Sequence, residues 1–271
     1  MKERNRDFVL KSFGITDVGL VREHNEDYYI IDEKLGLFIV ADGLGGHKGG
    51  EVASRLATDT ILKFFQEKPQ KELEEATINN KIDQAIQKAH QAILTLSPQD
   101  DSLKGMGTTV VLAFFRPPDS FSIANVGDSR AYLFRNQKME LLTQDHSAVA
   151  LLIQQGKITP VEARTHPSRN IVTQAIGIVG LAMGCYQRKL NLKDGDIIIL
   201  CSDGLWDMLA DESIEEIVLK ERRPKELCSN LIEATKQAGG KDNITVIVVS
   251  VEERQKELAV KAVAEAEIQQ V

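Results

Sequence analysis

The sequence predicts an α+β fold in which helices cover antiparallel β-sheets. Two observations support this fold class: short runs rich in β-branched and aromatic residues, and paired segments of helical periodicity that interrupt them. The expected strands are residues 8–16, 35–41, 109–115, 121–126, 131–134, 197–201 and 244–251. The expected helices are residues 51–66, 73–96, 214–219 and 224–238.

Antiparallel pairing is expected because of one connection between strands. Runs 109–115 and 121–126 are joined by the sequence Arg-Pro-Pro-Asp-Ser. Proline and aspartate favour turns, so this breaker-rich connection is suited to a hairpin. Two strands joined in this way run in opposite directions.

The helical segments are supported by the spacing of their apolar residues. In 73–96, isoleucines recur at intervals that place them on one side of a helix. The segment 224–238 opens with Pro224, whose missing N–H costs nothing in a first helical turn. Helices of this kind would cover a sheet with their apolar sides.

Composition places the 271-residue chain among soluble globular proteins, with 42% hydrophobic and 27% charged residues. There is no internal repeat or low-complexity linker, which favours one domain. The net charge of -7 gives no general attraction to nucleic acid or to anionic membranes, so neither is an expected partner. The N-terminal sequence lacks the apolar core of a secretory signal, and the longest apolar stretch is too short to cross a bilayer. A cytoplasmic location is therefore expected.

The cysteines favour reduced thiols over a disulfide framework or a zinc site. Cys185, Cys201 and Cys228 are odd in number and far apart in the sequence. None of them stands in a Cys-x5-Arg pattern, so a cysteine nucleophile that takes up phosphate is not expected.

Three aspartates stand at the ends of expected strands. Asp42 and Asp203 follow apolar runs, and Asp242 directly precedes one. Each has a turn-forming neighbour, and a turn alone would explain any one of them equally well. Carboxylates that meet at one sheet edge would repel one another unless cations lay between them. All-oxygen ligands favour Mg2+ or Mn2+ over zinc, and two such ions about 3.5–4 Å apart can activate a shared water.

Other charged and glycine-rich segments are open to two interpretations. Arg22 could orient a phosphate with its planar guanidinium, or the charged segment 22–27 could be a solvated turn. The glycine-rich segment 43–50 lacks the nucleotide-binding patterns, so room for the backbone near a metal-bound water explains its glycines better. Asp128 could bind a further cation or simply turn the chain.

Ordered motifs connect these segments. They are TDVGLVREHNEDYY from Thr16, ADGLGGHKGGEVAS from Ala41, GMGTT from Gly105, NVGDSRAY from Asn125, LTQDHS from Leu142, CSDGLWDML from Cys201 and GGKDNITVIVV from Gly239. Taken together, they resemble the metal-dependent type 2C (PPM family) serine/threonine protein phosphatases, and specifically their compact bacterial branch. The match covers residues 8–251.

The resemblance implies a four-layer α-β-β-α sandwich, in which two antiparallel β-sheets are flanked by helix pairs and metals lie in a cleft at one end. The phosphatase domain would span residues 1–252, with a mobile flap at about 147–170 beside the cleft. Residues 253–271 would form a C-terminal helical tail, either peripheral or able to bind a partner.

The resemblance also implies a set of site residues. Asp42 would bridge two Mn2+ or Mg2+ ions. The Gly43 carbonyl would bind one of these ions, and Asp203 and Asp242 would complete the ligands of the other. A third, weaker ion would be bound by Asp128. Arg22 would bind the phosphate, and the outer shell would consist of Glu26, Asp27 and Asn243.

The implied reaction is the hydrolysis of phosphoserine and phosphothreonine in proteins by a metal-activated water, without a phosphoenzyme intermediate. In animal relatives a histidine follows the Asp-Gly pair and supplies a proton, whereas Leu44 stands there in this chain. His47 and a metal-bound water are both candidates for that role. Expected partners are phosphorylated proteins, including a Ser/Thr kinase or its substrates, and a monomer is expected. The alternatives are an inactive binding module and a phosphatase for small metabolites.

Overall fold

The computed structural model describes residues 8–45, 48–67, 78–116, 119–180 and 184–254. Two five-stranded sheets lie at its centre, and every strand pairs with its neighbours in antiparallel fashion. The first sheet has the order β1 (Phe8–Asp17), β12 (Ile244–Glu253), β11 (Ile197–Cys201), β8 (Arg130–Arg135) and β9 (Lys138–Leu141). The second has the order β10 (Tyr186–Asn191), β7 (Ser120–Val126), β6 (Val110–Arg116), β3 (Leu37–Ala41) and β2 (Tyr28–Asp32). A short ribbon pairs β4 (Gly43–Leu44) with β5 (Gly107–Thr108).

The central strands are buried on both faces, which explains their unbroken apolar sequences. In β3, Phe38 and Val40 pack into the cluster between the sheets, whereas Leu37 and Ile39 pack into the cluster under the helices. Successive side chains of a strand point to opposite faces, so a strand covered on both sides has no polar face. The sheets therefore share one inner core and have a separate core under each helical layer.

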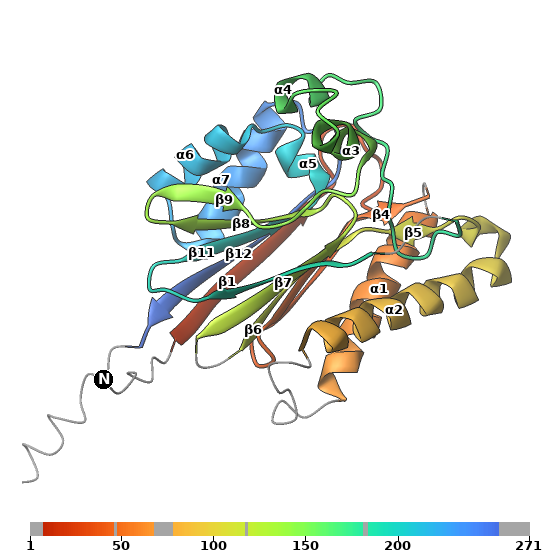
Figure 1. The fold of residues 1–271 in the computed structure, drawn as a ribbon, viewed down its shortest axis with the longest axis horizontal. Coiled ribbons are helices and arrows are strands. Elements are labelled where there is room, and N and C mark those ends of the chain that lie inside the picture. Colours follow the sequence, from red (N-terminus) through yellow and green to blue (C-terminus); the bar gives the residue numbers. More distant parts are fainter. Residues whose placement is uncertain (1–7, 46–47, 68–77, 117–118, 181–183, 255–271) are drawn as a thin grey trace, which may run out of the picture.

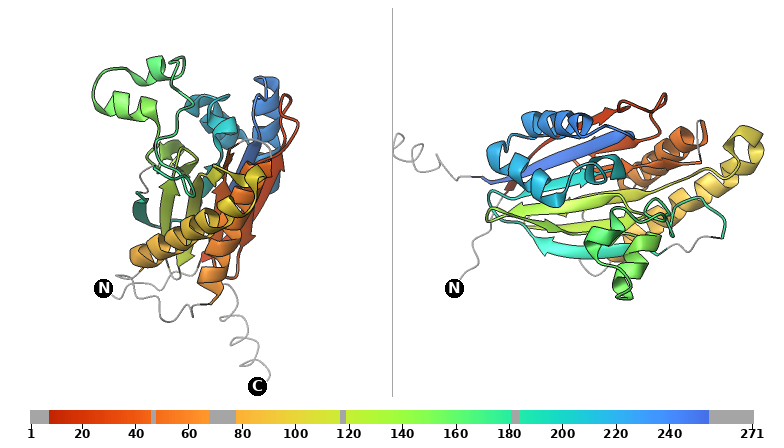
Figure 2. Two further views of the ribbon diagram at one scale, coloured as in Figure 1. Left: turned by 90° about the vertical axis from the view of Figure 1, so that its right-hand side faces the viewer. Right: turned by 90° about the horizontal axis from the view of Figure 1, so that it is seen from above.

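Helix pairs form the two outer layers. Helices α1 (Lys48–Gln66) and α2 (Ile78–Leu96) cover the second sheet, and α6 (Asp211–Lys220) and α7 (Pro224–Gln237) cover the first (Figures 1 and 2). The predicted α-β-β-α sandwich is thus confirmed. Within the described residues, no helix is long and apolar enough to cross a membrane.

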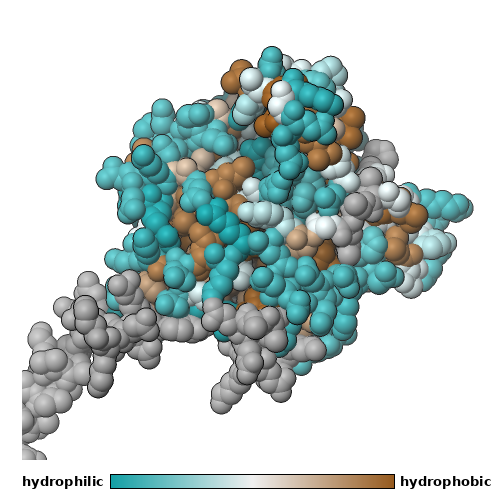
Figure 3. All heavy atoms as spheres, in the orientation of Figure 1, coloured by the Kyte–Doolittle hydropathy of each residue, from teal (hydrophilic) through white to brown (hydrophobic). Residues whose placement is uncertain are grey.

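The expected flap forms a small helical projection beside one end of the sandwich. It carries α3 (Ala148–Gln154) and α4 (Pro160–Ala163), which lie at the top of Figure 1. Backbone pairing between Ser147 and Val172 closes its base. Figure 3 shows hydrophobic atoms exposed over this projection, where Leu151 and Val161 contribute.

Several elements differ from the predictions. The strands β2, β4, β5, β9 and β10 were not expected, and short helices occur at α5 (Asp203–Trp206), η3 (Ser97–Gln99) and η4 (Asp101–Leu103). The interpretation of Asp203 as a turn residue is wrong, because this residue begins α5. The first helix begins at Lys48, slightly earlier than expected. Part of the segment 73–96 and residues 255–271 of the expected tail lie outside the described residues, so the domain division stays a prediction.

Candidate active site

A pocket of about 330 Å³ opens at the end of the sandwich beside the flap. Most of the predicted site residues line it: Arg22, Glu26, Asp42, Gly43, Asp128, Asp203, Asp242 and Asn243. They come from segments that are far apart in the sequence, as expected for side chains held at the ends of strands. Asp27 lies buried beside the pocket, and His47 lies outside the described residues.

Asp42 is fixed at the end of β3 by two threonines. Its backbone N–H donates to the Thr109 hydroxyl at 3.1 Å, and its carbonyl oxygen accepts from the Thr108 hydroxyl at 2.8 Å. The Thr109 hydroxyl also lies 2.7 Å from the Ser129 hydroxyl. These hydroxyl groups therefore hold the backbone at the end of β3.

Asp203 and Asp242 meet because β11 and β12 are antiparallel neighbours. The end of β11 and the start of β12 lie at the same edge, with Cys201 opposite Val246. Gly204 lets the two segments approach, since a Cβ there would collide with the Asn243 carbonyl oxygen. Asp203 and Asp242 thus come to line one pocket from adjacent strand ends.

Arg22 reaches the pocket from the loop after β1. Its Nη2 atom lies 2.7 Å from Asp242 Oδ2, and this hydrogen bond is the main reason why the pKa of Arg22 is raised. The loop is held by the Leu20 N–H, which donates to the Gly240 carbonyl at 2.7 Å. Both partners of the ion pair are well exposed, so the guanidinium remains accessible to a ligand.

The carboxyl groups around the pocket carry unfavourable charge. Burial, followed by the charges of neighbouring aspartates, raises the pKa of Asp42 and of Asp128 well above its usual range. Burial likewise raises the pKa of Asp203 to about 6 and that of Asp27 to about 7. Asp42 and Asp203 still have part of their surface open to the pocket. Such a cluster is stable in its charged form only if cations compensate it.

One buried oxygen has no partner. Asp27 Oδ2 accepts from the Ser202 hydroxyl at 2.7 Å, whereas Asp27 Oδ1 is buried without a hydrogen bond among the described atoms. A buried unsatisfied carboxylate oxygen is costly and points to a missing donor, such as a water of a hydrated ion. The residues present therefore fit a site for hard, hydrated cations.

The donors do not form a closed cage. Within the described residues, no three Asp, Glu, His or Cys side chains are grouped so that they could enclose one ion. Mg2+ and similar ions usually keep several water ligands and take one or two carboxylates. The open arrangement is consistent with ions of that kind and not with a structural zinc site.

Asn243 and Glu26 support the site from its side. The Asn243 side chain accepts from the Glu26 N–H at 2.8 Å and donates to the carbonyl oxygens of Val18 and His24. Its amide is thus bound to the backbone of the Arg22 loop. The Glu26 side chain lies against Gly50 at the start of α1, where a Cβ would collide with it.

Three charged pocket residues were missed by the sequence analysis. Arg169, Asp207 and Lys241 also line the pocket, and Arg169 Nε lies 3.8 Å from Asp207 Oδ1. Asp207 and Lys241 belong to the motifs CSDGLWDML and GGKDNITVIVV, which gave a signal, whereas Arg169 lies in a loop whose position depends on the tertiary fold.

Comparison with known proteins gives a consistent family. A family model described as Protein phosphatase 2C matches residues 21–242. The chain is 37% identical over 237 residues to the Serine/threonine phosphatase stp of Listeria innocua, covering 86% of this chain and 93% of that protein. It is 36% identical over 256 residues to the Protein phosphatase PhpP of Streptococcus pneumoniae, covering 90% of this chain and 98% of that protein.

Solved structures agree with these relatives. The Serine/threonine phosphatase Stp1 from Staphylococcus aureus has a TM-score of 0.84 at 33% identity, covering 93% of this chain and 99% of that chain. The catalytic domain of the serine threonine protein phosphatase PstP, in complex with 2 manganese ions, has a TM-score of 0.79 at 33% identity. That comparison covers 91% of this chain and 100% of the PstP chain.

Proposed function

The chain belongs to the protein phosphatase 2C family and is a metal-dependent serine/threonine phosphatase, and we propose that its pocket hydrolyses phosphoserine and phosphothreonine in proteins. The observation that supports this most is the meeting of Asp42, Asp128, Asp203 and Asp242 with Arg22 in one pocket. Acidic residues would hold cations, and the arginine would hold the phosphate that the cations attract.

The proposed ligands are oxygen donors that line the pocket. Asp42, the Gly43 carbonyl, Asp203 and Asp242 would hold two Mn2+ or Mg2+ ions, and Asp128 would hold a third, weaker one. When bound, such ions lower the pKa of a water molecule and neutralise charge on the transferring phosphoryl group. The orphaned Asp27 Oδ1 would accept a hydrogen bond from a water of this hydrated site, with Glu26 beside it.

Arg22 would orient the phosphate. Its planar guanidinium can donate to two phosphate oxygens, and the ion pair with Asp242 places it at the pocket. The charge of Asp242 is thereby shared between the arginine and the proposed cation, so both would be aligned by the same carboxylate.

A direct attack by water, without a phosphoenzyme, is supported by the state of the hydroxyl groups near Asp42. Thr108, Thr109 and Ser129 use their hydroxyls in mutual or backbone hydrogen bonds. Nucleophilic hydroxyl groups need an adjacent base, such as a histidine, to be activated. The hydroxyl groups of these three residues instead hold the strand ends in place.

Two candidates could donate the proton to the leaving group: His47 and a metal-bound water. Leu44 lines the pocket where animal relatives would have a histidine, and His47 lies outside the described residues. His47 therefore stays a prediction. The proposed substrates are phosphorylated proteins, including a Ser/Thr kinase or the proteins that it modifies, because the relatives are named as Ser/Thr phosphatases.

Peptide dephosphorylation tests the proposal. With Mn2+ added, the wild type should dephosphorylate a phosphothreonine peptide, and Asp203→Asn should lose about 10³-fold or more of this rate because a cation ligand and its charge are lost. The control Asp101→Asn changes an exposed aspartate and should retain the rate.

Other outcomes identify the alternatives. A folded wild type that binds no Mn2+ and is inactive would indicate a binding module. Faster hydrolysis of sugar phosphates or nucleotides than of the peptide would indicate a metabolite phosphatase. Full activity of Asp203→Asn would contradict the assigned metal site.

A further inference from the structure

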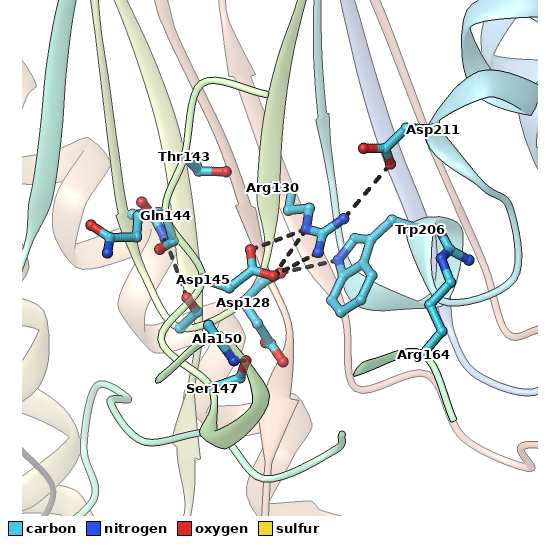
Figure 4. A network of polar contacts seen from close by, with 12 residues as sticks. Asp128, Arg130, Thr143, Gln144, Asp145, Ser147, Ala150, Arg164, Trp206 and Asp211 are labelled. Carbon is cyan, nitrogen blue, oxygen red and sulfur yellow. Dashed lines mark hydrogen bonds and ion pairs between the residues drawn. The ribbon is translucent and has the colours of Figure 1, made fainter. Parts of the chain in front are cut away.

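A polar cluster lies between the flap and the body of the protein, next to the pocket. It consists of Trp206, Arg130, Asp145, Tyr132 and Asp211, and we call it the Trp206 cluster. Trp206 is the one tryptophan of the chain and belongs to α5. Figure 4 shows the Arg130 side chain between Asp145 and the Trp206 ring.

Arg130 fixes the plane of the Trp206 ring. Its guanidinium carbon lies 3.7 Å from the ring centroid, which is a close cation–π contact. Asp145 binds the same guanidinium through Nε at 3.0 Å and Nη2 at 2.6 Å, and the Tyr132 hydroxyl accepts from Nη1 at 3.1 Å. With so many partners, Arg130 has one position, and the indole that stacks on it has one orientation.

The indole N–H points at the backbone of Asp128. Trp206 Nε1 donates to the Asp128 carbonyl oxygen at 3.0 Å. Asp128 lies in the short connection between β7 and β8, after Gly127, whose φ is 103°. A connection that contains glycine has much conformational freedom, so an added bond restricts it. His146 already binds the backbone of Gly127 in this connection, and the Trp206 bond adds a constraint at Asp128 itself.

The same helical turn also carries Asp203. Asp203 and Trp206 are the first and last residues of α5, and Asp203 and Asp128 both line the pocket. The bond from Trp206 to the Asp128 carbonyl thus connects the backbone of Asp128 to the helix that begins at Asp203. Cation sites depend on the separation of their ligands to within fractions of an ångström.

We propose that Trp206, aligned by the Arg130–Asp145 pair, is a positioning residue that holds Asp128 at the correct place for its cation. The inference rests on the proposed function, which assigns a cation to Asp128. The competing explanation is that Trp206 only packs against the core under α6 and α7, which its partly buried ring also contacts. The two explanations differ in whether loss of the indole N–H weakens cation binding at Asp128.

The first test counts bound Mn2+ ions by the electron paramagnetic resonance signal of the free ion. Trp206→Phe keeps an aromatic ring for Arg130 but removes the donor, so the weakest Mn2+ site should bind about 3- to 10-fold more weakly while the tighter sites are unchanged. Asp128→Asn should lose the weakest site, and adding Trp206→Phe to it should cause no further change.

The matched control is Tyr29→Phe. The Tyr29 hydroxyl donates to the Gly14 carbonyl at 3.0 Å, so this variant also removes one aromatic donor to a backbone carbonyl, but on β2. It should leave all Mn2+ affinities unchanged. An equal loss of Mn2+ affinity in Tyr29→Phe would overturn the inference but not the ion assignment. The same holds if Trp206→Phe binds Mn2+ as tightly as the wild type while Asp128→Asn loses the ion. A third ion that is absent from the wild type, or unchanged in Asp128→Asn, would overturn the ion assignment as well.

A second measurement needs no change of Trp206. Titration with Mg2+ should change the intrinsic fluorescence of Trp206 in the wild type as the weakest site fills, because charge arrives next to the residue that its N–H contacts. Asp128→Asn should lack this phase. If the Trp206 fluorescence of the wild type does not change while the weakest site fills with Mg2+, the inference is overturned. This result would hold even if Trp206→Phe failed to fold.

Discussion

Buried carboxylates in this protein fall into two groups that differ in what compensates their charge. Asp196, which is 1% exposed, accepts from Arg135 at 2.7 and 2.6 Å, and Asp145 is bound by Arg130 in the same bidentate way. In the described part of the chain, no lysine or arginine forms an ion pair with Asp27, Asp42 or Asp128. The chain therefore supplies arginines to Asp196 and Asp145, and among the described residues it supplies none to Asp27, Asp42 or Asp128.

The two groups differ in how their charge affects the stability of the folded protein. Asp196 and Asp145 are neutralised by arginines, whereas burial, followed by the charges of neighbouring groups, raises the pKa of Asp27, Asp42 and Asp128. Carboxylates without an arginine partner lower the stability of the folded protein, as binding sites often do. Substitutions in the two groups should therefore have opposite effects.

The largest expected effect is that of Asp42→Asn. Activity with Mn2+ should fall about 10³-fold, because the substitution removes a carboxylate that would hold the proposed cations. Without metal, the free energy of unfolding should rise by on the order of 1 kcal/mol, because a buried charge among like charges is removed. Urea denaturation in the presence of a chelator measures this, and a metal-free variant that is less stable than the wild type would break the comparison.

Next comes Asp196→Asn, which should lower the stability of the protein and leave its activity unchanged. It leaves Arg135 and the Lys193 N–H without their ionic partner, so the free energy of unfolding should fall by about 3 kcal/mol. The rate per folded molecule should be unchanged, since Asp196 does not line the pocket. The control Asp101→Asn breaks a surface pair with Lys104 and should change stability by less than about 0.5 kcal/mol.

The smallest effect concerns His90, a titratable group with a neutral partner. Its Nδ1 accepts from the Gly177 N–H at 3.0 Å, and burial lowers its pKa. Because the unfolded state then binds more protons, this contribution to stability is present above about pH 6.5 and is lost as the pH falls toward the lowered value. Compared with His90→Gln, the wild type should lose slightly more stability between pH 7 and pH 5.5 in urea titrations. An identical pH dependence of both proteins would show that His90 is not coupled to folding.

Much of the fold was predictable from local patterns, and the missed strands have a common reason. The expected strands are mostly the central ones, whose two buried faces give continuous apolar sequences. The missed strands β2, β9 and β10 are all at sheet edges and contain polar residues, as in Lys138–Leu141. Edge strands take their conformation from a neighbour on one side, so their own sequence carries a weaker signal.

The site divides in a similar way. Three site residues could be predicted from the sequence because each stands next to the end or the start of a clearly apolar strand. They are Asp42, Asp203 and Asp242, and all three line one pocket. The role of Trp206 could not be found, because a bond to a backbone carbonyl depends on the tertiary position of Asp128 and not on its side chain. Asn243, expected in the outer shell, lines the pocket, and its amide also holds the backbone of the Arg22 loop.

The pairing of β1 with β12 has a consequence for how the enzyme is made. Arg22 and Asp242 form their ion pair although they are 220 positions apart, and the loop between them contains almost every other element. Closing so long a loop is slow and requires both of its ends. During synthesis on the ribosome, a growing chain therefore cannot form the Arg22–Asp242 ion pair until the segment that carries Asp242 has emerged, so the proposed phosphate site is completed late.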